Sequence, residues 1–119
     1  MNSWTRDDRI VLLETWPQVG PIDQTRSVNH AVDYARWHHV AVTMDRDSDE
    51  AIMYVDGERV QLAASNFAND FLDNQALSVG RYRGTPEGLL PFHFQGMIDD
   101  LRIYDVALSN TEIEAIRKE

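Results

Sequence analysis

The strongest fold signal lies in residues 37–62, WHHVAVTMDRDSDEAIMYVDGERVQL. Residues 37–44 alternate between two sets of side chains, which is the period of a β-strand. Both sets include apolar side chains, so we expect both faces of this strand to be at least partly covered. Residues 45–50 are polar and acidic, and residues 51–55 resume the strand with β-forming side chains. The pattern predicts a β-hairpin with a solvated loop.

A second, tighter turn follows at Asp56-Gly57. This residue pair is favoured in two-residue hairpin turns because both positions tolerate positive φ. Residues 58–62 then return as a short partner strand. Two consecutive hairpins predict an antiparallel meander.

Further strand and loop signals follow toward the C-terminus. Residues 76–79 predict a strand that ends at Gly80, and the Gly- and Pro-containing residues 81–91 predict an exposed loop. Residues 92–104 predict the last and longest strand. Gly96 inside it indicates a bulge or a close backbone approach.

The C-terminus carries a helix signal. Ser109-Asn110-Thr111-Glu112 has the pattern of a capping box, in which the serine hydroxyl accepts a backbone amide and the glutamate reaches back to the cap. We expect a short helix through Arg117. Apolar side chains at helical spacing would dock it on the edge of the sandwich, namely Leu108, Ile113 and Ile116.

The N-terminal third has weaker signals. Residues 10–13 predict one buried strand, residues 17–21 a turn and residues 27–34 a weak strand. No repeat or linker composition marks a domain boundary, so residues 1–119 predict a single domain. Five or more short strands with frequent turns predict an all-β antiparallel sandwich with a short C-terminal helix.

Composition excludes several classes of function. Twenty acidic residues against eleven basic ones give a net charge of −9, which argues against nucleic acid and anionic membranes as partners. No apolar run approaches the roughly 20 residues needed to cross a bilayer. The chain has no cysteine, so disulfides, thiolate metal sites and cysteine nucleophiles are excluded.

Several segments, in the order in which they occur, resemble one family. They are Trp37-His38-His39-Val40-Ala41, Tyr54-Val55-Asp56-Gly57, Leu77-Ser78-Val79-Gly80-Arg81, Phe94-Gln95-Gly96-Met97-Ile98-Asp99-Asp100-Leu101-Arg102-Ile103-Tyr104 and Ala107-Leu108-Ser109. The set resembles the laminin-G-like branch of the concanavalin A-like lectin/glucanase superfamily, which includes the pentraxins.

This resemblance implies an antiparallel jelly-roll β-sandwich of two curved sheets. It covers residues 37–116, whereas residues 1–36 are expected to be an atypical or abbreviated N-terminal part that lacks the family's opening strands. The last strand, residues 92–104, is then expected to expose an edge that a second chain can pair with. The resemblance also implies a secreted or cell-surface protein with further domains.

Acidic residues in the first hairpin loop do not form a convincing site. Glucanases of this superfamily place two carboxylates on one strand, and no strand here has that layout. Asp47, Asp49 and Glu50 fall in a predicted turn and are expected to be solvated. A calcium loop of the EF-hand type would need glycine where Glu50 stands.

Asp99 is the carboxylate with a predicted role. By alternation it shares a face with apolar side chains, namely Met97, Leu101 and Ile103. A charge in that environment needs a partner. The resemblance implies a structural Ca²⁺ bound by this aspartate, and the alternative is a hydrogen bond to His39 or to a backbone amide. On the opposite face, Asp100 is expected to form a surface ion pair with Arg102.

The four histidines do not predict a metal site or a catalytic triad. His38 and His39 are adjacent in a strand and point to opposite faces, while His30 and His93 are isolated. Packed or hydrogen-bonded histidines are expected instead.

Candidate ligand-binding residues follow from the chemistry of sugar recognition, which uses an aromatic plate for the apolar face of a sugar and planar polar groups for its hydroxyls. The candidates are Trp16, Arg81, Tyr82 and Arg83. The alternative is that Trp16 and Tyr82 cover the core.

The sequence therefore predicts a non-catalytic binding or adhesion module, with glycans or another protein as partners, from a larger exported protein. One alternative is a fragment of a glycan-processing enzyme of the same superfamily. Another is an assembly domain that forms oligomers through an uncovered strand edge.

Overall fold

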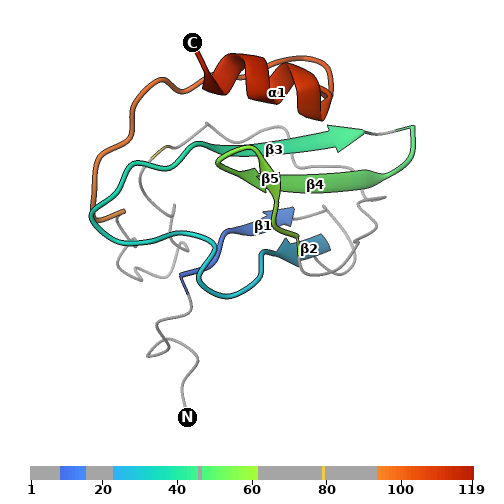
Figure 1. Ribbon diagram of the computed structural model, residues 1–119. Coiled ribbons are helices and arrows are strands. Elements are labelled where there is room, and N and C mark those ends of the chain that lie inside the picture. The colour runs from blue at the N-terminus through green and yellow to red at the C-terminus, as the bar shows by residue number, and fades with distance from the viewer. Residues whose placement is uncertain (1–8, 16–22, 46, 62–78, 80–93) are drawn as a thin grey trace. The chain divides into compact units, whose positions relative to one another are not determined.

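The computed structural model describes residues 9–15, 23–45, 47–61, 79 and 94–119 (Figure 1). The chain forms two compact units, Met1–Phe71 with Tyr104–Glu119, and Leu72–Ile103. The expected loop at 81–91 and all but the last residue of the expected strand at 76–79 lie outside the described residues. None of the described helices is long and apolar enough to cross a membrane.

The first unit contains two antiparallel sheets, as expected of a β-sandwich protein. One consists of β1 (Leu12–Thr15) and β2 (Asp23–Arg26). The other has the order β3 (Val40–Asp45), β4 (Glu50–Val55) and β5 (Glu58–Arg59). The predicted meander is therefore confirmed, and its tight turn has the expected positive φ of 52° at Asp56 and 84° at Gly57.

The hairpin of β3 and β4 separates an apolar face from a mixed one. Its register places Val42 opposite Met53 and Thr43 opposite Ile52. Because opposite residues share a face, one side of the hairpin carries Val40, Val42, Met44, Ala51, Met53 and Val55. The β4 members of this set are buried, so the core of the unit lies against β4.

Ser27 joins the two sheets. It is fully buried and forms an isolated bridge with Gln61. Its backbone N–H donates to the carbonyl of Val11 at 2.9 Å, and its hydroxyl accepts the N–H of Val11 at 2.9 Å and donates to the carbonyl of Val28 at 3.0 Å. Next to it, Gln61 donates to the hydroxyl of Thr25 at 3.2 Å.

The expected weak strand at 27–34 is wrong. Beyond Ser27 the chain turns, and His30 has a φ of 60° that a strand does not permit. The strand in this region is β2, whose sequence Asp-Gln-Thr-Arg has no apolar alternation.

The expected last strand at 92–104 is also wrong for residues 94–104, none of which lies in a strand or bridge. A strand requires a neighbour that pairs with its backbone. Asp100 additionally adopts a positive φ of 52°, and its N–H donates to Oδ1 of Asp99 at 2.8 Å. The local bond and the turn interrupt the extended backbone. The bulge or close backbone approach expected at Gly96 is not seen, because Gly96 lies in a bend outside any strand and the atoms near it belong to the ring of Phe94.

The C-terminal helix α1 (Asn110–Arg117) is confirmed together with its capping box. The hydroxyl of Ser109 accepts the N–H of Glu112 at 3.2 Å and donates to the Glu112 carboxylate at 3.0 Å. Ile113 is buried. The carboxylate of Glu114 lies against Gly57, where a Cβ would come within 2.5 Å of it and Glu114 would have to move. The φ of 84° at Gly57 is the stronger reason for glycine, since other residues are strained there.

Candidate functional site

Asp56 connects the tight turn to the start of β3. One oxygen of its carboxylate accepts the backbone N–H of His39 at 2.9 Å, and the other lies 2.7 Å from Nδ1 of His38. The N–H of Asp56 in turn donates to the carbonyl of His39 at 2.8 Å. These bonds fix the residues directly before β3, which begins at Val40 instead of the expected residue 37.

His38 is hydrogen-bonded on both ring nitrogens, as the sequence predicted for the histidines in general. Nε2 accepts the backbone N–H of Asp33 at 2.9 Å. The proton of the neutral ring therefore lies on Nδ1 and is donated to Asp56. The His38 side chain is only 10% exposed. An Asp–His pair of this kind also occurs in catalytic triads, but here the nitrogen that would act as the base is occupied by a backbone amide.

The bond from Asp33 extends this network into the loop that precedes β3. The carboxylate of Asp33 is paired with Arg36 at 3.1 Å and with Arg9 at 3.5 Å. The guanidinium of Arg9 also lies over the ring of Tyr34, 5.5 Å from its centroid. The loop is thus tied to the turn at Asp56 through His38.

Two large aromatic side chains of this loop point to solvent. Tyr34 is 70% exposed and Trp37 is 62% exposed. The sequence predicted Trp37 as part of a covered strand, and that expectation is wrong because β3 begins three residues later. We refer to residues 33–37 as the aromatic loop. The sequence signal for this loop, which our sequence analysis missed, is two aromatic residues, Tyr34 and Trp37, beside the arginine at position 36.

The pKa of the Asp56 carboxyl lies below its ordinary value. Partial burial raises this pKa, but the opposing effects are larger together. They are the backbone N–H of His39, the side-chain hydrogen bond of His38 and the charge of Arg36. Asp56 therefore favours its ionised form, which is the form that accepts both hydrogen bonds.

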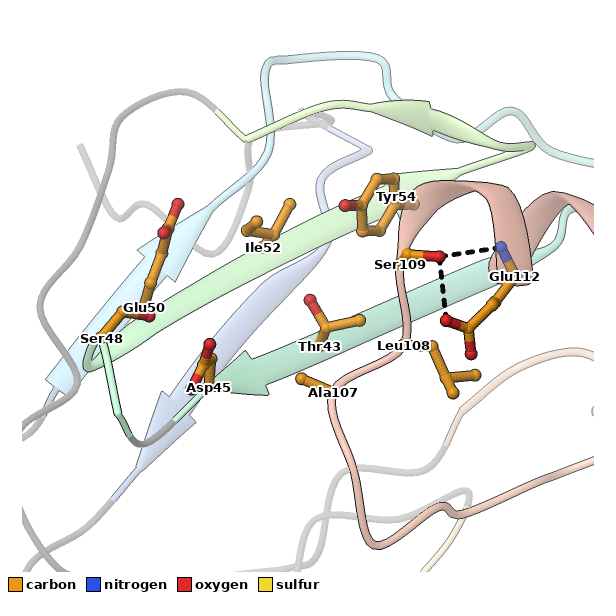
Figure 2. A pocket seen from close by; sticks show the side chains of 10 residues that line it. All are labelled: Thr43, Asp45, Ser48, Glu50, Ile52, Tyr54, Ala107, Leu108, Ser109 and Glu112. Carbon is orange, nitrogen blue, oxygen red and sulfur yellow. Dashed lines mark hydrogen bonds between the residues drawn. The ribbon is translucent and has the colours of Figure 1, made fainter.

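A separate pocket lies between the hairpin of β3 and β4 and the start of α1 (Figure 2). Its volume is about 280 Å³, just below the range that is usual for small-molecule sites. The side chains that line it are Thr43, Asp45, Ser48, Glu50, Ile52, Tyr54, Ala107, Leu108, Ser109 and Glu112. It is rich in hydroxyls and carboxylates.

The carboxylates of this pocket come from different elements. Asp45 and Glu50 are directly opposite each other on β3 and β4, and Glu112 belongs to the first turn of α1. Glu50 lies 3.6 Å from the guanidinium of Arg59, and Glu112 accepts the hydroxyl of Ser109. Asp45 and Glu112 are exposed, unlike the buried carboxylic acid that protonates a leaving group in a glycosidase.

Three comparisons relate the chain to known proteins. A family model described as "Concanavalin A-like lectin/glucanases superfamily" matches residues 4–114. The chain belongs to this superfamily. A solved structure of an S-layer domain-containing protein (residues 221–444) from Clostridium thermocellum is similar, with a TM-score of 0.61 and 22% identity over 98% of this chain and 68% of the other. No curated protein matches.

Membership of the concanavalin A-like superfamily confirms the family that the sequence resembled and agrees with its predicted sandwich fold. The superfamily takes its name from lectins and from glucanases. Membership alone therefore does not distinguish sugar binding from sugar hydrolysis. That distinction depends on the chemistry of the site residues.

Asp99, the predicted calcium ligand of this concanavalin A-like domain, lies in an exposed segment. Its Oδ1 accepts the N–H of Asp100, which is a hydrogen bond to a backbone amide. The predicted ion pair of Asp100 with Arg102 is confirmed at 2.9 Å. Within the described part of the chain, no three acidic or histidine side chains cluster as metal ligands. The described residues alone do not form a calcium site, and the role of Asp99 as a calcium ligand stays a prediction.

The predicted ligand-binding residues Trp16, Arg81, Tyr82 and Arg83 all lie outside the described residues. They stay predictions. The described residues offer two other places where a ligand can bind, the aromatic loop and the pocket beside α1.

Proposed function

We propose that this domain is a non-catalytic carbohydrate-binding module of a cell-surface protein, and that it binds its ligand at the aromatic loop. The observation that carries the proposal is the exposure of both Tyr34 and Trp37. Contact between a large aromatic ring and water is unfavourable, and a ligand that covers the ring removes this contact. Exposed apolar patches therefore often mark binding sites.

The aromatic loop combines the two kinds of group that sugar recognition requires. The ring of Trp37 offers an apolar plate for the C–H face of a sugar. The ion pair of Asp33 and Arg36 is close to it in the chain and offers acceptors and donors for hydroxyl groups. Neutral sugars are also compatible with a net charge of −9, which disfavours polyanions.

The hydrogen bonds behind the loop support the same function. The backbone of Asp33 is held by His38, and His38 is held by Asp56. A loop that is ordered before binding loses less conformational entropy when the ligand arrives. This network therefore favours a preformed binding surface.

Two observations favour binding over catalysis. Nε2 of His38 accepts a backbone N–H and so does not face a nucleophile. Asp45 and Glu112 in the pocket are exposed, whereas a catalytic acid usually needs burial to raise its pKa. The alternative is that the chain is part of a glycan-processing enzyme. It would be supported if a purified protein containing this chain released reducing sugars from a polysaccharide.

A location at the cell surface is part of the proposal. Its support is the laminin-G-like character of the sequence and the solved structure with a similar fold, which is described as an S-layer domain-containing protein.

Glycan-array screening followed by titration calorimetry tests the carbohydrate proposal. We expect Trp37→Ala and Tyr34→Ala each to weaken binding about fivefold or more, because each removes stacking worth about 1 kcal/mol or more. Tyr104→Ala is the matched control, since it removes an aromatic ring that is 47% exposed in a different segment of the chain. Weakening by Trp16→Ala or Tyr82→Ala alone would move the site to the sequence-predicted residues. The absence of binding to any glycan would refute the function.

A second candidate function is assembly with another protein through an exposed segment. Residues 94–106 carry seven large apolar side chains that face solvent, namely Phe94, Met97, Ile98, Leu101, Ile103, Tyr104 and Val106. Exposed sets of this size mark protein interaction sites. Concentration-dependent association in sedimentation velocity tests this function.

A further inference from the structure

The pocket beside α1 contains a buried hydroxyl without a hydrogen-bond partner. Tyr54 is only 6% exposed, and its side chain lines the pocket. Figure 2 shows the hydroxyl directed along β4 toward Ile52, into the pocket. It makes no hydrogen bond to any described residue. Buried polar groups are nearly always hydrogen-bonded, so an unpartnered one that is aimed into a cavity indicates a ligand that completes it.

The carboxylates of the pocket lie at its two ends. Asp45 and Glu50, which we call the acidic pair, are opposite each other at the loop end of the hairpin. Figure 2 shows Glu112 at the other end, beside Tyr54 and the start of α1. Glu50 and Tyr54 are four residues apart on β4, which separates the two ends by roughly 13 Å along the strand. Within the described residues no three acidic or histidine side chains are grouped as metal ligands, so one metal ion does not bridge the ends.

The acidic pair places two like charges face to face. Like charges directly opposite each other on neighbouring strands destabilise a sheet. The guanidinium of Arg59 lies 3.6 Å from Glu50 and offsets part of this charge, but Arg59 does not line the pocket. No basic side chain is among the described residues that line it. A positive charge bound at the acidic pair would therefore replace repulsion by attraction.

Both ends of the pocket have acceptor oxygens available. Oδ1 of Asp45 accepts the backbone N–H of Asp47 at 2.9 Å, and Oε1 of Glu112 accepts the hydroxyl of Ser109 at 3.0 Å. The second oxygen of each of these two carboxylates makes no hydrogen bond to a described residue. A ligand for this pocket therefore needs hydrogen-bond donors at both of its ends.

We propose that this pocket binds a linear aliphatic diamine, with one ammonium at the acidic pair and the other at Glu112 and Tyr54. An ammonium group has three donors and no acceptor, which matches the carboxylate and hydroxyl oxygens. The alkyl chain lies between the ends against Ile52 and Leu108, and the volume of about 280 Å³ restricts the ligand to a small molecule. The net charge of −9 also attracts cations. The inference is independent of the carbohydrate proposal, which concerns the aromatic loop.

Titration of the full chain with 1,4-diaminobutane, followed by amide chemical shifts in NMR, tests the class of ligand. At pH 7 and constant ionic strength both amines are protonated. We expect shifts at the residues that line the pocket, binding of 1-aminobutane weaker by about tenfold because it has one ammonium, and no binding of 1,4-butanediol. Equal binding of 1-aminobutane would overturn the two-ended site, and equal binding of the diol would overturn the cationic class. The absence of pocket shifts with the diamine would overturn the proposal as a whole.

Tyr54→Phe isolates the buried hydroxyl, because it removes one oxygen and keeps the ring. We expect diamine binding to weaken about tenfold, since a hydrogen bond to a charged group is lost. The urea midpoint of the free protein should not fall, because the hydroxyl has no partner among the described residues. A lower midpoint with unchanged binding would assign the hydroxyl a structural role and overturn it as a ligand contact.

Glu50→Gln and Glu112→Gln test the two ends of the pocket. We expect each to weaken diamine binding about threefold, since a solvated ion pair contributes little. Glu58→Gln is the matched control, because Glu58 is opposite Val55 and so lies on the other face of the sheet from Tyr54. Equal weakening by all three variants would indicate general attraction to the acidic protein and overturn the site.

Discussion

The carboxylate of Asp56 lies 2.7 Å from Nδ1 of His38, which is eighteen positions before it and directly follows the aromatic loop. Through this bond a turn residue helps to position that loop. Asp56 also accepts the N–H of His39. The sequence pattern explains Asp56 by its tolerance of positive φ in a tight turn. The structure adds a second role, which is to hold the residues directly before β3 at the same end of the hairpin.

Replacing Asp56 by asparagine separates these two roles. The substituted side chain would keep the turn, because asparagine also tolerates positive φ, but it would lose the charge that accepts both hydrogen bonds. We expect Asp56→Asn to lower the free energy of unfolding by about 1–2 kcal/mol. The expected loss of stability is moderate because the carboxylate is 42% exposed, so water can replace part of its hydrogen bonding. Urea unfolding measures the change, and Glu58→Gln, which alters an exposed neighbour, should change stability little.

The pH dependence of stability follows from the lowered pKa of Asp56. A carboxyl whose pKa is lower in the folded state stabilises the protein above its unfolded pKa and loses this contribution as pH falls through the folded pKa. The stability difference between the parent chain and Asp56→Asn should therefore be constant near neutral pH and shrink below about pH 4. Urea midpoints at pH 7, 4 and 3 measure it. A difference that grows on acidification would contradict the assignment.

The elements that we predicted correctly from the sequence are those whose structure is determined by residues close to them in the chain. The meander from β3 to β5 depends on alternation and on the turn at Asp56-Gly57, and helix α1 depends on the capping box at Ser109. In both cases the residues that determine the structure are within a few positions of the residues that adopt it. Such local signals can be read without knowledge of the tertiary fold.

The elements that sequence missed depend on distant contacts. β2 has no apolar alternation and is defined by its register with β1. Residues 94–106 have strand propensity but lie in no sheet. The exposure of Trp37 follows from where β3 begins, and Asp56, at the end of the paired strand β4, holds the residues directly before that point. Propensity does not contain this information, because pairing and burial are tertiary.

Ser27 provides a test of how the two sheets are joined. Its buried hydroxyl accepts the N–H of Val11 and donates to the carbonyl of Val28. Ser27→Ala leaves two backbone groups without this partner, and we expect it to destabilise the protein by about 1–3 kcal/mol. Ser48→Ala is the control, because Ser48 lies in an exposed turn. Equal melting temperatures for the two variants would argue against Ser27 as the junction.

Calcium binding by Asp99 can be measured directly. The described residues do not surround Asp99 with other ligands, so a calcium site would need residues from other parts of the protein. If the ion binds the folded state, millimolar Ca²⁺ must raise the melting temperature relative to a chelator, and Asp99→Asn must abolish the shift. Equal melting temperatures with Ca²⁺ and with chelator would remove Asp99 as a ligand.

The link between His38 and the aromatic loop gives the last prediction. In the folded chain the N–H of Asp33 is donated to Nε2 of His38, so its exchange with solvent requires the loop to open. His38→Phe keeps a ring of similar shape but removes both hydrogen bonds. We expect faster amide hydrogen exchange at Asp33 in this variant, because the local opening costs less free energy.

The N–H of Asp47 is the internal control for this experiment, since it donates to the side chain of Asp45 in the distant hairpin loop at 2.9 Å. Its exchange should not change in His38→Phe. If exchange accelerates equally at Asp33 and Asp47, the substitution destabilises the whole unit and the specific link is wrong. If only Asp33 accelerates, the loop is held by His38, and the same variant should weaken glycan binding when Trp37 is present but not in a Trp37→Ala background.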